Sequence, residues 1–258
     1  MDSSDPPSRS IIITGASSGI GEALAYDYAA PGVTLWLSGR NLGRLDAVAA
    51  VCRDRGATTH PECIDVADMA AMTAWIGRTA AAGAINLVIA NAGISGGTSG
   101  IGHEDAQQTR DIFAVNLAGV LNTVLPALDA MQRQGFGQIA LVSSVAGFRG
   151  LPHAPAYSAS KAAVLAYGDG LRGELRGSGI DVTVICPGFV VSRITDANSY
   201  HMPLIMTADR AAGIIRRGLE RKRARITFPW PMRIGTWFAQ ALPTWIMDPI
   251  LTRMPRRK

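Results

Sequence analysis

The sequence predicts a doubly wound α/β fold, in which a parallel sheet of about seven strands is covered by helices on both faces. Two observations predict it. Short, mostly apolar runs of four to six residues alternate with longer segments of helical length, and such runs suit strands that are buried on both faces. The first run is followed at once by a glycine-rich turn that opens into a helix, as at the start of a β-α-β unit. At 258 residues with 48% apolar side chains, the chain fits one large domain better than two small ones.

The predicted elements follow one another in regular alternation. Apolar runs predict strands at residues 11–14, 33–38, 85–90, 139–143 and 182–186, with weaker candidates at 58–64 and 225–228. Segments of helical length lie between them, at residues 19–30, 42–55, 68–81 and 105–134. Because such alternation implies right-handed crossovers, the strands are expected to build one sheet. We therefore expect a single domain over residues 1–228, with a lid over about 189–212, and a basic amphipathic helical extension over residues 229–258.

Composition limits the classes of protein to consider. The three cysteines, Cys52, Cys63 and Cys186, are scattered, which favours reduced thiols over a disulfide framework or a metal site, and we expect no metal. The first ten residues are polar and rich in proline, and no uncharged apolar run reaches the roughly 18 residues that a membrane span needs. We expect a cytoplasmic protein.

The positive charge of the chain is concentrated near its C-terminus. Residues 216–258 contain 11 Lys or Arg and two acidic side chains, whereas residues 1–215 contain 14 basic and 18 acidic ones. The net charge of +5 is thus a property of the end of the chain, and we expect no nucleic-acid binding from it. In the same region, apolar side chains recur at helical spacing over residues 234–242. Two interpretations stay open: peripheral contact with the inner face of an anionic membrane, or packing over the substrate cleft or a partner subunit.

The turn after the first predicted strand reads Thr14-Gly15-Ala16-Ser17-Ser18-Gly19-Ile20-Gly21. Gly15 permits a tight turn, Gly19 lets a pyrophosphate approach the backbone, and Gly21 lets the helix pack closely on the strand. The N–H groups at the start of the helix then face the anion. The alternative is an ordinary glycine-rich turn between a strand and a helix. We expect the loop to bind the phosphates of a dinucleotide through Gly15, Ser17, Ser18, Gly19, Ile20 and Gly21.

Tyr157 and Lys161 lie four residues apart in the segment Tyr157-Ser158-Ala159-Ser160-Lys161. On a helix they share one face, so the ammonium can lie close to the phenol. A free tyrosine has a pKa of about 10, and a neighbouring cation favours the phenolate and brings proton exchange nearer to neutral pH. The pair predicts a proton donor and its activating cation, although the same spacing also occurs in helices without such a function.

Two further polar residues are candidates for the same chemistry. Ser144 ends the fifth predicted strand, and the strand ends of a doubly wound sheet are where ligands bind. Its hydroxyl could polarise a substrate carbonyl, or it could simply bond to the backbone. Asn116 lies on the apolar stripe of the predicted helix over residues 105–134, where a polar side chain must be hydrogen-bonded. One interpretation is a satisfied core amide that bends the helix, and the other is a functional group.

Together, these motifs resemble the classical short-chain dehydrogenase/reductase family over roughly residues 9–192. The glycines follow a threonine with the spacing Gly-x-x-x-Gly-x-Gly, and Ser144 precedes Tyr157 by thirteen residues, as the catalytic serine does in that family. The resemblance implies a Rossmann-type sheet and a nicotinamide cofactor that contacts Tyr157 and Lys161. It also implies that Asn116 holds a water in a proton relay with the lysine. The implied catalytic set is Asn116, Ser144, Tyr157 and Lys161.

The resemblance implies further contacts with the cofactor. Asn91-Ala92-Gly93 matches the family's Asn-Ala-Gly, although Ala90 stands where a second asparagine is common. Asp65-Val66 matches the pair that contacts adenine, and Pro187-Gly188 matches the turn beside the nicotinamide. Ser192 keeps the hydroxyl of a threonine that is frequent at its position.

The end of the second predicted strand selects between the two nicotinamide cofactors. An acidic side chain there would accept hydrogen bonds from the ribose hydroxyls of NAD. The chain has Ser38-Gly39-Arg40-Asn41 instead, and Arg40 offers a planar cation suited to a 2′-phosphate, with Ser38 or Asn41 adding hydrogen bonds. We therefore expect NADP(H) to be favoured over NAD(H); the alternative is a solvated arginine and no preference.

The predicted lid is rich in methionine and aliphatic side chains and has few charges, which fits an apolar or bulky substrate. The same side chains could instead only fill the gap between the lid and the body. His153 could serve as a catalytic base. Because Tyr157 already fills that role, we expect His153 to lie in the wall of the substrate pocket.

These observations predict an oxidoreductase that moves a hydride between NADP(H) and a carbonyl or alcohol carbon of a small apolar substrate, with Tyr157 as proton donor or acceptor. Because members of the resembled family usually pair through the helices that contain Asn116 and Tyr157, we expect a homo-oligomer, a dimer or a tetramer. The alternative from another class is a sensor or scaffold protein that binds NADP(H) without turnover. An epimerase or dehydratase on the same scaffold also stays open.

Overall fold

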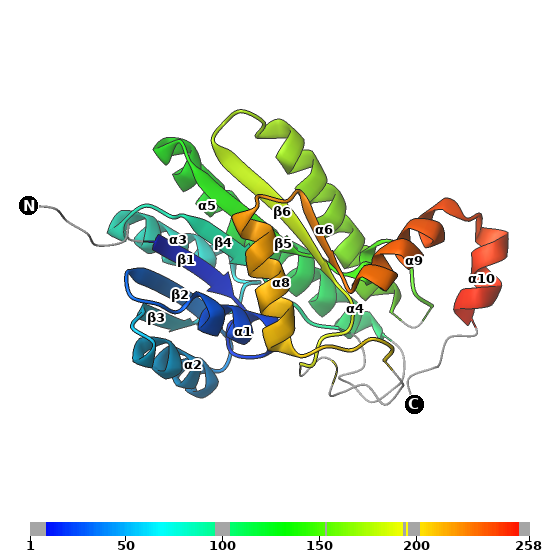
Figure 1. Ribbon diagram of the computed structural model, residues 1–258, viewed down its shortest axis with the longest axis horizontal. Helices are drawn as coiled ribbons and strands as arrows, with labels where there is room; N and C mark the ends of the chain where they lie inside the picture. The colour runs from blue at the N-terminus through cyan, green and yellow to red at the C-terminus, as the bar shows by residue number, and fades with distance from the viewer. Residues whose placement is uncertain (1–8, 96–103, 153, 193–194, 196–201, 253–258) are drawn as a thin grey trace, which may run out of the picture.

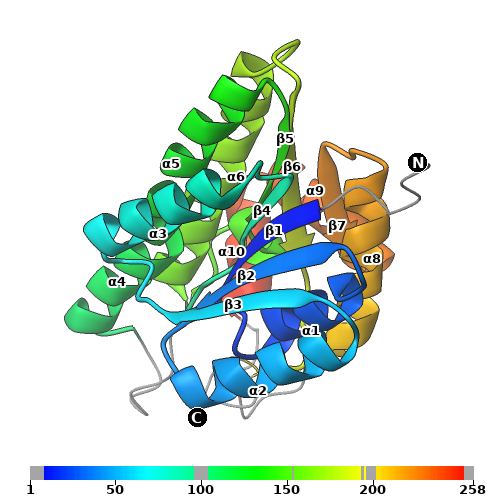
Figure 2. The ribbon, with the colours of Figure 1, turned by 90° about the vertical axis from the view of Figure 1, so that its left-hand side faces the viewer.

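The computed structural model describes residues 9–95, 104–152, 154–192, 195 and 202–252. Seven parallel strands form one sheet in the order β3-β2-β1-β4-β5-β6-β7, and helices cover both faces (Figures 1 and 2). The strands are β1 (Arg9–Thr14), β2 (Val33–Gly39), β3 (Thr58–Cys63), β4 (Leu87–Ala90), β5 (Gly137–Val142), β6 (Ile180–Pro187) and β7 (Arg225–Phe228). The predicted doubly wound α/β class is confirmed.

The helices alternate with the strands, as the sequence predicts. They are α1 (Gly19–Tyr28), α2 (Leu42–Asp54), α3 (Met69–Ala82), α4 (Ala106–Phe113), α5 (Gly119–Gln134), α6 (Pro155–Glu174), α8 (Ala208–Glu220), α9 (Trp230–Ala241) and α10 (Thr244–Thr252), with a π-helical turn η1 (Ala114–Ala118) and a 3-10 turn η2 (Val145–Gly147). Because α8 begins at Ala208, the segment predicted to cover the substrate ends before residue 212.

Alternate side chains of β1 enter two separate cores. Ile11 and Ile13 pack with residues of α1, α2 and α8 on one face of the sheet, whereas Ile12 packs with residues of α3, α5 and α6 on the other. Figure 2 shows these two helical layers on either side of the sheet. In register, Ile11 pairs with Leu35 of β2 and Leu87 of β4. Because both faces of the central strands are covered, β1, β4 and β5 are largely apolar, which is why the sequence reveals them, whereas the edge strand β3 is polar and partly exposed.

The strand order reverses at β1, since the chain builds β2 and β3 on one side of it and then crosses to β4 on the other. In open α/β sheets, ligands bind at this reversal, outside the carboxyl ends of the strands. The glycine-rich turn follows β1 there, and Asn91 follows β4. The fold therefore brings two motifs that lie far apart in the sequence to the same edge of the sheet.

The helix predicted over residues 105–134 is divided in three. α4 ends at Phe113, η1 spans Ala114–Ala118 with Asn116 inside it, and α5 continues from Gly119. Periodicity did not reveal the π-turn, because apolar residues keep recurring at three- and four-residue steps through it. By length and composition this composite helix could cross a membrane, but half of its most apolar window is buried inside the protein. It packs along α3 and α6, as a core helix does.

Candidate active site

The glycine-rich turn adopts a conformation that its glycines allow. Gly15 and Gly19 have φ angles of +65° and +59°, in the left-handed region that favours glycine. A Cβ on Gly15 would lie 2.8 Å from the Cα of Ala92, and one on Gly21 would lie 2.4 Å from the carbonyl oxygen of Gly15. The turn is therefore pressed against the end of β4, and α1 begins within it at Gly19, so the helix N-terminus lies in the loop.

Thr14 and Asn91 fasten the ends of β1 and β4 to each other. The Thr14 hydroxyl accepts hydrogen bonds from the backbone N–H groups of Asn91 and Ala92, at 3.1 Å each. The Asn91 side-chain amide donates to the carbonyl oxygens of Thr14 and Gly15, at 2.9 and 3.3 Å. Asn91 therefore has a structural role at the joined ends of these two strands. The importance of Thr14 was not foreseen, because its partners lie more than 70 residues away.

The end of β2 places Arg40 in an exposed position beside the glycine-rich turn. A Cβ on Gly39 would lie 3.0 Å from the Ser17 hydroxyl oxygen, so the glycine-rich turn packs against the residue that precedes Arg40. Of Ser38 and Asn41, suggested as additional ligands, only Asn41 has a side-chain hydrogen bond; the Ser38 hydroxyl has no hydrogen-bond partner among the described residues. Ser38 is fully buried, and the Asn41 side chain caps α2 by accepting a hydrogen bond from the backbone N–H of Arg44 at 2.9 Å.

The remaining cofactor candidates lie around the same edge. Asp65 is exposed after β3, and its carboxylate accepts from the backbone N–H of Ala67 at 2.9 Å. Val66 is buried against α5, so closely that a Cβ on Gly119 would lie 2.5 Å from its Cγ2 atom. Ser192 lies on the other side, where its Cβ is 2.9 Å from the position of a Cβ on Gly19. Pro187 ends β6 and Gly188 follows it.

Tyr157 and Lys161 lie on α6 with the ammonium beside the phenol ring, as their spacing predicts. The Lys161 Nζ is 5.9 Å from the centroid of the Tyr157 ring. It donates a hydrogen bond to the carbonyl oxygen of Val142 at 3.0 Å, and the side chain is only 3% exposed. Burial lowers the pKa of Lys161 to about 8, and the nearby Cys186 thiol acts weakly in the opposite direction. Burial therefore makes the charged form of Lys161 energetically unfavourable in the folded protein.

Asn116 joins this pair through the turn that follows β4. Its amide exchanges two hydrogen bonds with the backbone of Ile94, at 2.8 and 2.9 Å, and donates a third to the Ser160 hydroxyl at 3.1 Å. A Cβ on Gly93 would lie 3.2 Å from both the Asn116 Oδ1 and the Lys161 Nζ. Asn116 is thus a satisfied core amide that also lies next to the lysine, so the geometry is compatible with both interpretations made from the sequence.

The two neighbouring serines after β5 have different partners. The Ser143 hydroxyl donates to the carbonyl oxygen of Lys161 at 2.7 Å and so ties the strand end to α6. The Ser144 hydroxyl accepts from the backbone N–H of Ala146 at 3.1 Å and makes only a long contact, 3.5 Å, to the carbonyl oxygen of Pro187. Ser144 lies just beyond the strand rather than at its end, because β5 stops at Val142. Of the two hydroxyl groups, that of Ser144 donates the weaker hydrogen bond.

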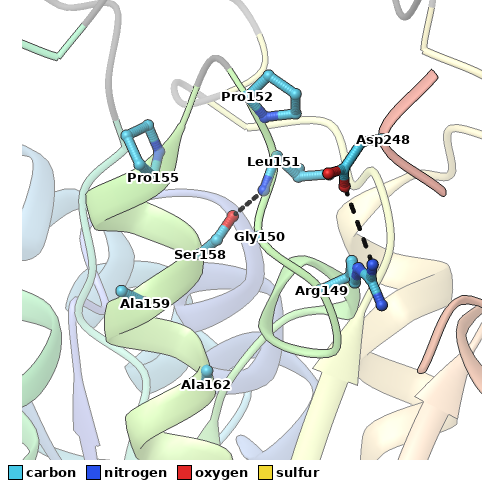
Figure 3. Close-up of a pocket in the computed structure, with 9 residues that line it drawn as sticks. All are labelled: Arg149, Gly150, Leu151, Pro152, Pro155, Ser158, Ala159, Ala162 and Asp248. Carbon is cyan, nitrogen blue, oxygen red and sulfur yellow. Dashed lines mark hydrogen bonds and ion pairs between the residues drawn. The ribbon is translucent and has the colours of Figure 1, made fainter. Parts of the chain in front are cut away.

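A cavity of about 440 Å³ lies nearby but outside this group (Figure 3). On the α6 side it is bordered by Pro155, Ser158, Ala159 and Ala162, which occupy a different face of the helix from Tyr157. Residues 149–152 and Asp248 close it. We therefore do not assign it to the substrate. His153, considered for the wall of the substrate pocket, lies outside the described residues.

Glu104 is a residue that the sequence analysis missed. Its carboxylate accepts hydrogen bonds from the backbone N–H groups of Ala156 and Tyr157, at 2.6 and 3.1 Å. These N–H groups belong to the first turn of α6, whose own N-cap residue, Ala154, provides no side-chain hydrogen bond. Glu104 therefore caps the helix of Tyr157 from a distant part of the chain. No local pattern could signal this, because the partners are 52 and 53 residues apart.

Replacing Glu104 with alanine is expected to lower the free energy of unfolding by about 1–2 kcal/mol, because two first-turn N–H groups lose their acceptor. The turnover rate should fall as well, since the backbone of Tyr157 is one of the groups released. Urea unfolding and steady-state kinetics measure the two effects. Glu104→Gln keeps an acceptor oxygen and should recover most of both; if Glu104→Ala matches the wild type in both measurements, the cap is unimportant.

Comparison with known proteins agrees with this geometry. A model of the short chain dehydrogenase family matches residues 9–202. A protein of Myxococcus xanthus described as an uncharacterized oxidoreductase is 38% identical over 247 residues, which cover 95% of this chain and 97% of that protein. An uncharacterized oxidoreductase of Mycobacterium tuberculosis is 32% identical over 255 residues, covering 95% and 96%.

Two solved structures illustrate the shared fold. A short-chain dehydrogenase from Sphingobium yanoikuyae in complex with NADPH superposes with a TM-score of 0.78 at 27% identity, covering 96% of each chain. A short-chain dehydrogenase/reductase from Burkholderia phymatum in complex with NAD gives 0.81 at 24% identity, covering 95% of each chain. The fold and the family match define an oxidoreductase of a class that uses nicotinamide cofactors. The chain belongs to the short-chain dehydrogenase family.

Proposed function

We propose that the protein reduces carbonyl groups of apolar substrates with NADPH, or oxidises the corresponding alcohols, and that Tyr157 exchanges the proton. The observation that carries the proposal is the buried ammonium of Lys161 beside the Tyr157 ring. Burying a cation is unfavourable, and a protein that only bound the cofactor would need no such group. The positive charge next to the phenol favours the phenolate and so brings proton exchange toward neutral pH.

The residues present fit a dinucleotide. Gly15, Gly19 and Gly21 leave no room for a Cβ, and α1 begins within the turn, so a helix N-terminus lies there; this is the arrangement that receives a pyrophosphate. Asp65, Val66 and the segment from Asn91 to Gly93 border the same edge of the sheet. A bound NADPH supplies the hydride in such a site.

Residues of the protein transfer the proton and stabilise the charge on the substrate oxygen. Tyr157 donates a proton to the carbonyl oxygen as that oxygen gains negative charge, and the Ser144 hydroxyl orients the same oxygen and stabilises the charge. The positive charge of Lys161 favours the phenolate form of Tyr157. Asn116 lies beside the lysine near Gly93, where it can hold the water that returns a proton to the pair. In the oxidative direction the same groups act in reverse.

Arg40 supports a preference for NADP(H). It follows β2 in an exposed position, directly after Gly39, which packs against Ser17, and the adenosine ribose of a cofactor bound at the sheet edge would lie near this strand end. A guanidinium binds a phosphate through two parallel hydrogen bonds, and a hydroxyl can add a third. No carboxylate stands at this strand end to bind the free ribose hydroxyls of NAD.

Replacing Arg40 with alanine is expected to reduce kcat/KM for NADPH by about 10- to 100-fold, the value of one or two charge-assisted hydrogen bonds. The kcat/KM for NADH should change little, so the preference for NADPH disappears. Arg44→Ala, an exposed arginine one helical turn further along, serves as the matched control. Equal losses of kcat/KM with NADPH and NADH would show that Arg40 does not bind the 2′-phosphate.

The described part of the lid supports an apolar substrate. Val191, Leu204 and Ile205 are each between 43% and 52% exposed, so these side chains do not merely fill space between the lid and the body. For the assembly, we propose a homo-oligomer that pairs through the composite helix, which exposes Phe113 and Leu125. Sedimentation of wild type and Leu125→Glu would test that surface.

The proposal is tested by titrating the protein with NADPH and NADH and then following NADPH consumption against a panel of apolar ketones and aldehydes. Selective NADPH binding with turnover of several panel members is the expected result. Tight binding with no turnover on any of them would favour a sensor of NADP(H). Conversion of a substrate without net consumption of NADPH would favour an epimerase or dehydratase.

A further inference from the structure

The two C-terminal helices carry four large apolar side chains that are exposed. On α9, Trp230, Ile234 and Phe238 follow one another at four-residue steps and are 72%, 50% and 52% exposed. On α10, Trp245 is 75% exposed. We call these four residues the apolar ridge. Helices that only cover a core hide such side chains, and exposed large apolar side chains at helical spacing, as on α9, mark a surface that contacts an apolar partner.

The ridge is carried by helices that are fixed to the body, not by a loose tail. Met232 of α9 packs on the turn after β6, where a Cβ on Gly188 would lie 2.4 Å from its Sδ atom. Arg149 donates to the carbonyl oxygen of Leu242 at 3.1 Å and lies 4.0 Å from the Asp248 carboxylate across the cavity in Figure 3. Met247 is buried. Figure 1 shows both helices at one end of the molecule.

The charge of the C-terminal segment indicates which kind of surface the apolar ridge contacts. Residues 229–258 contain five basic side chains and a single acidic one, Asp248, which faces Arg149. Arg233 is exposed on α9 next to Ile234, and the chain ends in Arg253-Met254-Pro255-Arg256-Arg257-Lys258 directly after α10. By its composition this segment is complementary to an anionic surface and not to a second copy of the same basic segment.

We propose that the apolar ridge docks on the surface of an anionic lipid bilayer. Tryptophan rings partition to the boundary between headgroups and acyl chains, and neighbouring arginine and lysine side chains are attracted to anionic headgroups. The contacts of Met232 and Arg149 attach the two helices to the body of the protein, and the lipid-facing side chains are already exposed before docking. Docking needs neither the cofactor nor turnover, and it does not depend on the proposed function.

Co-sedimentation with large unilamellar vesicles tests the proposal. Wild-type protein should bind vesicles of phosphatidylcholine with phosphatidylglycerol, bind pure phosphatidylcholine much more weakly, and be released by salt. The double variant Trp230→Ala/Trp245→Ala should lose about ten-fold or more in vesicle partitioning. The matched control is Leu42→Ala/Met69→Ala, which removes two exposed apolar side chains, 51% and 67% exposed, from α2 and the start of α3. It should bind as the wild type does.

Two further measurements keep the result interpretable. Circular dichroism and thermal unfolding confirm that both double variants remain folded. Sedimentation velocity without vesicles shows whether the tryptophan variant changes the oligomeric state. Failure of the wild type to bind anionic vesicles, or equal binding by the tryptophan variant, would overturn the proposal. A loss of oligomers in the tryptophan variant with no vesicle binding by the wild type would instead assign the ridge to a subunit interface, and would equally overturn it.

Discussion

Tyr157→Phe is expected to lower kcat by about 10²–10⁴-fold, the range that a positioned general acid contributes. The substitution removes only the hydroxyl that donates the proton, while the ring and the phosphate-binding turn stay as they are. Binding of NADPH, measured by fluorescence titration, should therefore stay within about two-fold of the wild type. Stopped-flow and steady-state kinetics with any accepted ketone measure the loss.

Tyr167→Phe is the matched control for this substitution. Tyr167 lies on the same helix, ten residues further along, and its hydroxyl is buried without a hydrogen-bond partner. Removing that hydroxyl should leave kcat unchanged. The smallest loss expected on removal of a general acid is about 100-fold. If Tyr157→Phe lowers kcat by less than about ten-fold, Tyr157 is not the proton donor.

Lys161→Met is expected to abolish turnover and yet to stabilise the cofactor-free protein at pH 7. Burial lowers the pKa of Lys161 to about 8, below its ordinary value of 10.5, which means that the folded state disfavours the charged form. An apolar side chain of similar length removes this cost and forfeits one hydrogen bond to Val142. The net gain should be on the order of 1–3 kcal/mol in the free energy of unfolding.

The sign of the pH dependence follows from the same pKa. Below about pH 8 the lysine is charged in both states and the cost is fully present. Between about pH 8 and 10.5 the folded protein has released the proton while the unfolded chain still binds it, so the wild type gains stability as the pH rises. The advantage of Lys161→Met should therefore be largest at pH 7 and shrink toward pH 10.

Urea unfolding at pH 7 and pH 10 measures this difference. Lys222→Met is the control, because that lysine is 69% exposed in a surface ion pair with Asp181 and should contribute less than about 1 kcal/mol at either pH. A Lys161→Met variant that is less stable than the wild type at pH 7, or whose advantage does not change with pH, would contradict the assignment of a destabilising buried cation.

The sequence predicted the sheet well, because strands buried on both faces leave continuous apolar runs and because glycine-rich turns mark strand ends. It also predicted that Tyr157 and Lys161 share one helical face, since that relation is local. The π-turn around Asn116 was missed, because a wide turn keeps nearly the same apolar spacing as an α-helix. Ser38 was proposed as a ligand from its position at a strand end, but only the packing of the glycine-rich turn reveals that it is buried.

Long-range contacts set the limit of such prediction. Glu104 reaches the first turn of α6, and Thr14 reaches Asn91 and Ala92, each across more than 50 residues. Neither residue belongs to a local pattern of charge or spacing. The choice between Ser143 and Ser144 rested on a family spacing, and the structure adds the physical difference, a committed bond from Ser143 to the backbone of α6.

The transfer of label from the cofactor tests the central claim most directly. The protein is incubated with an accepted apolar ketone and NADPH that carries deuterium at both C4 positions of the nicotinamide, and the product alcohol is analysed by mass spectrometry. We expect deuterium on the carbinol carbon in step with NADPH oxidised, and almost none with Tyr157→Phe. Alcohol formed without deuterium at that carbon, or equal label transfer by Tyr157→Phe, would contradict hydride transfer assisted by this tyrosine.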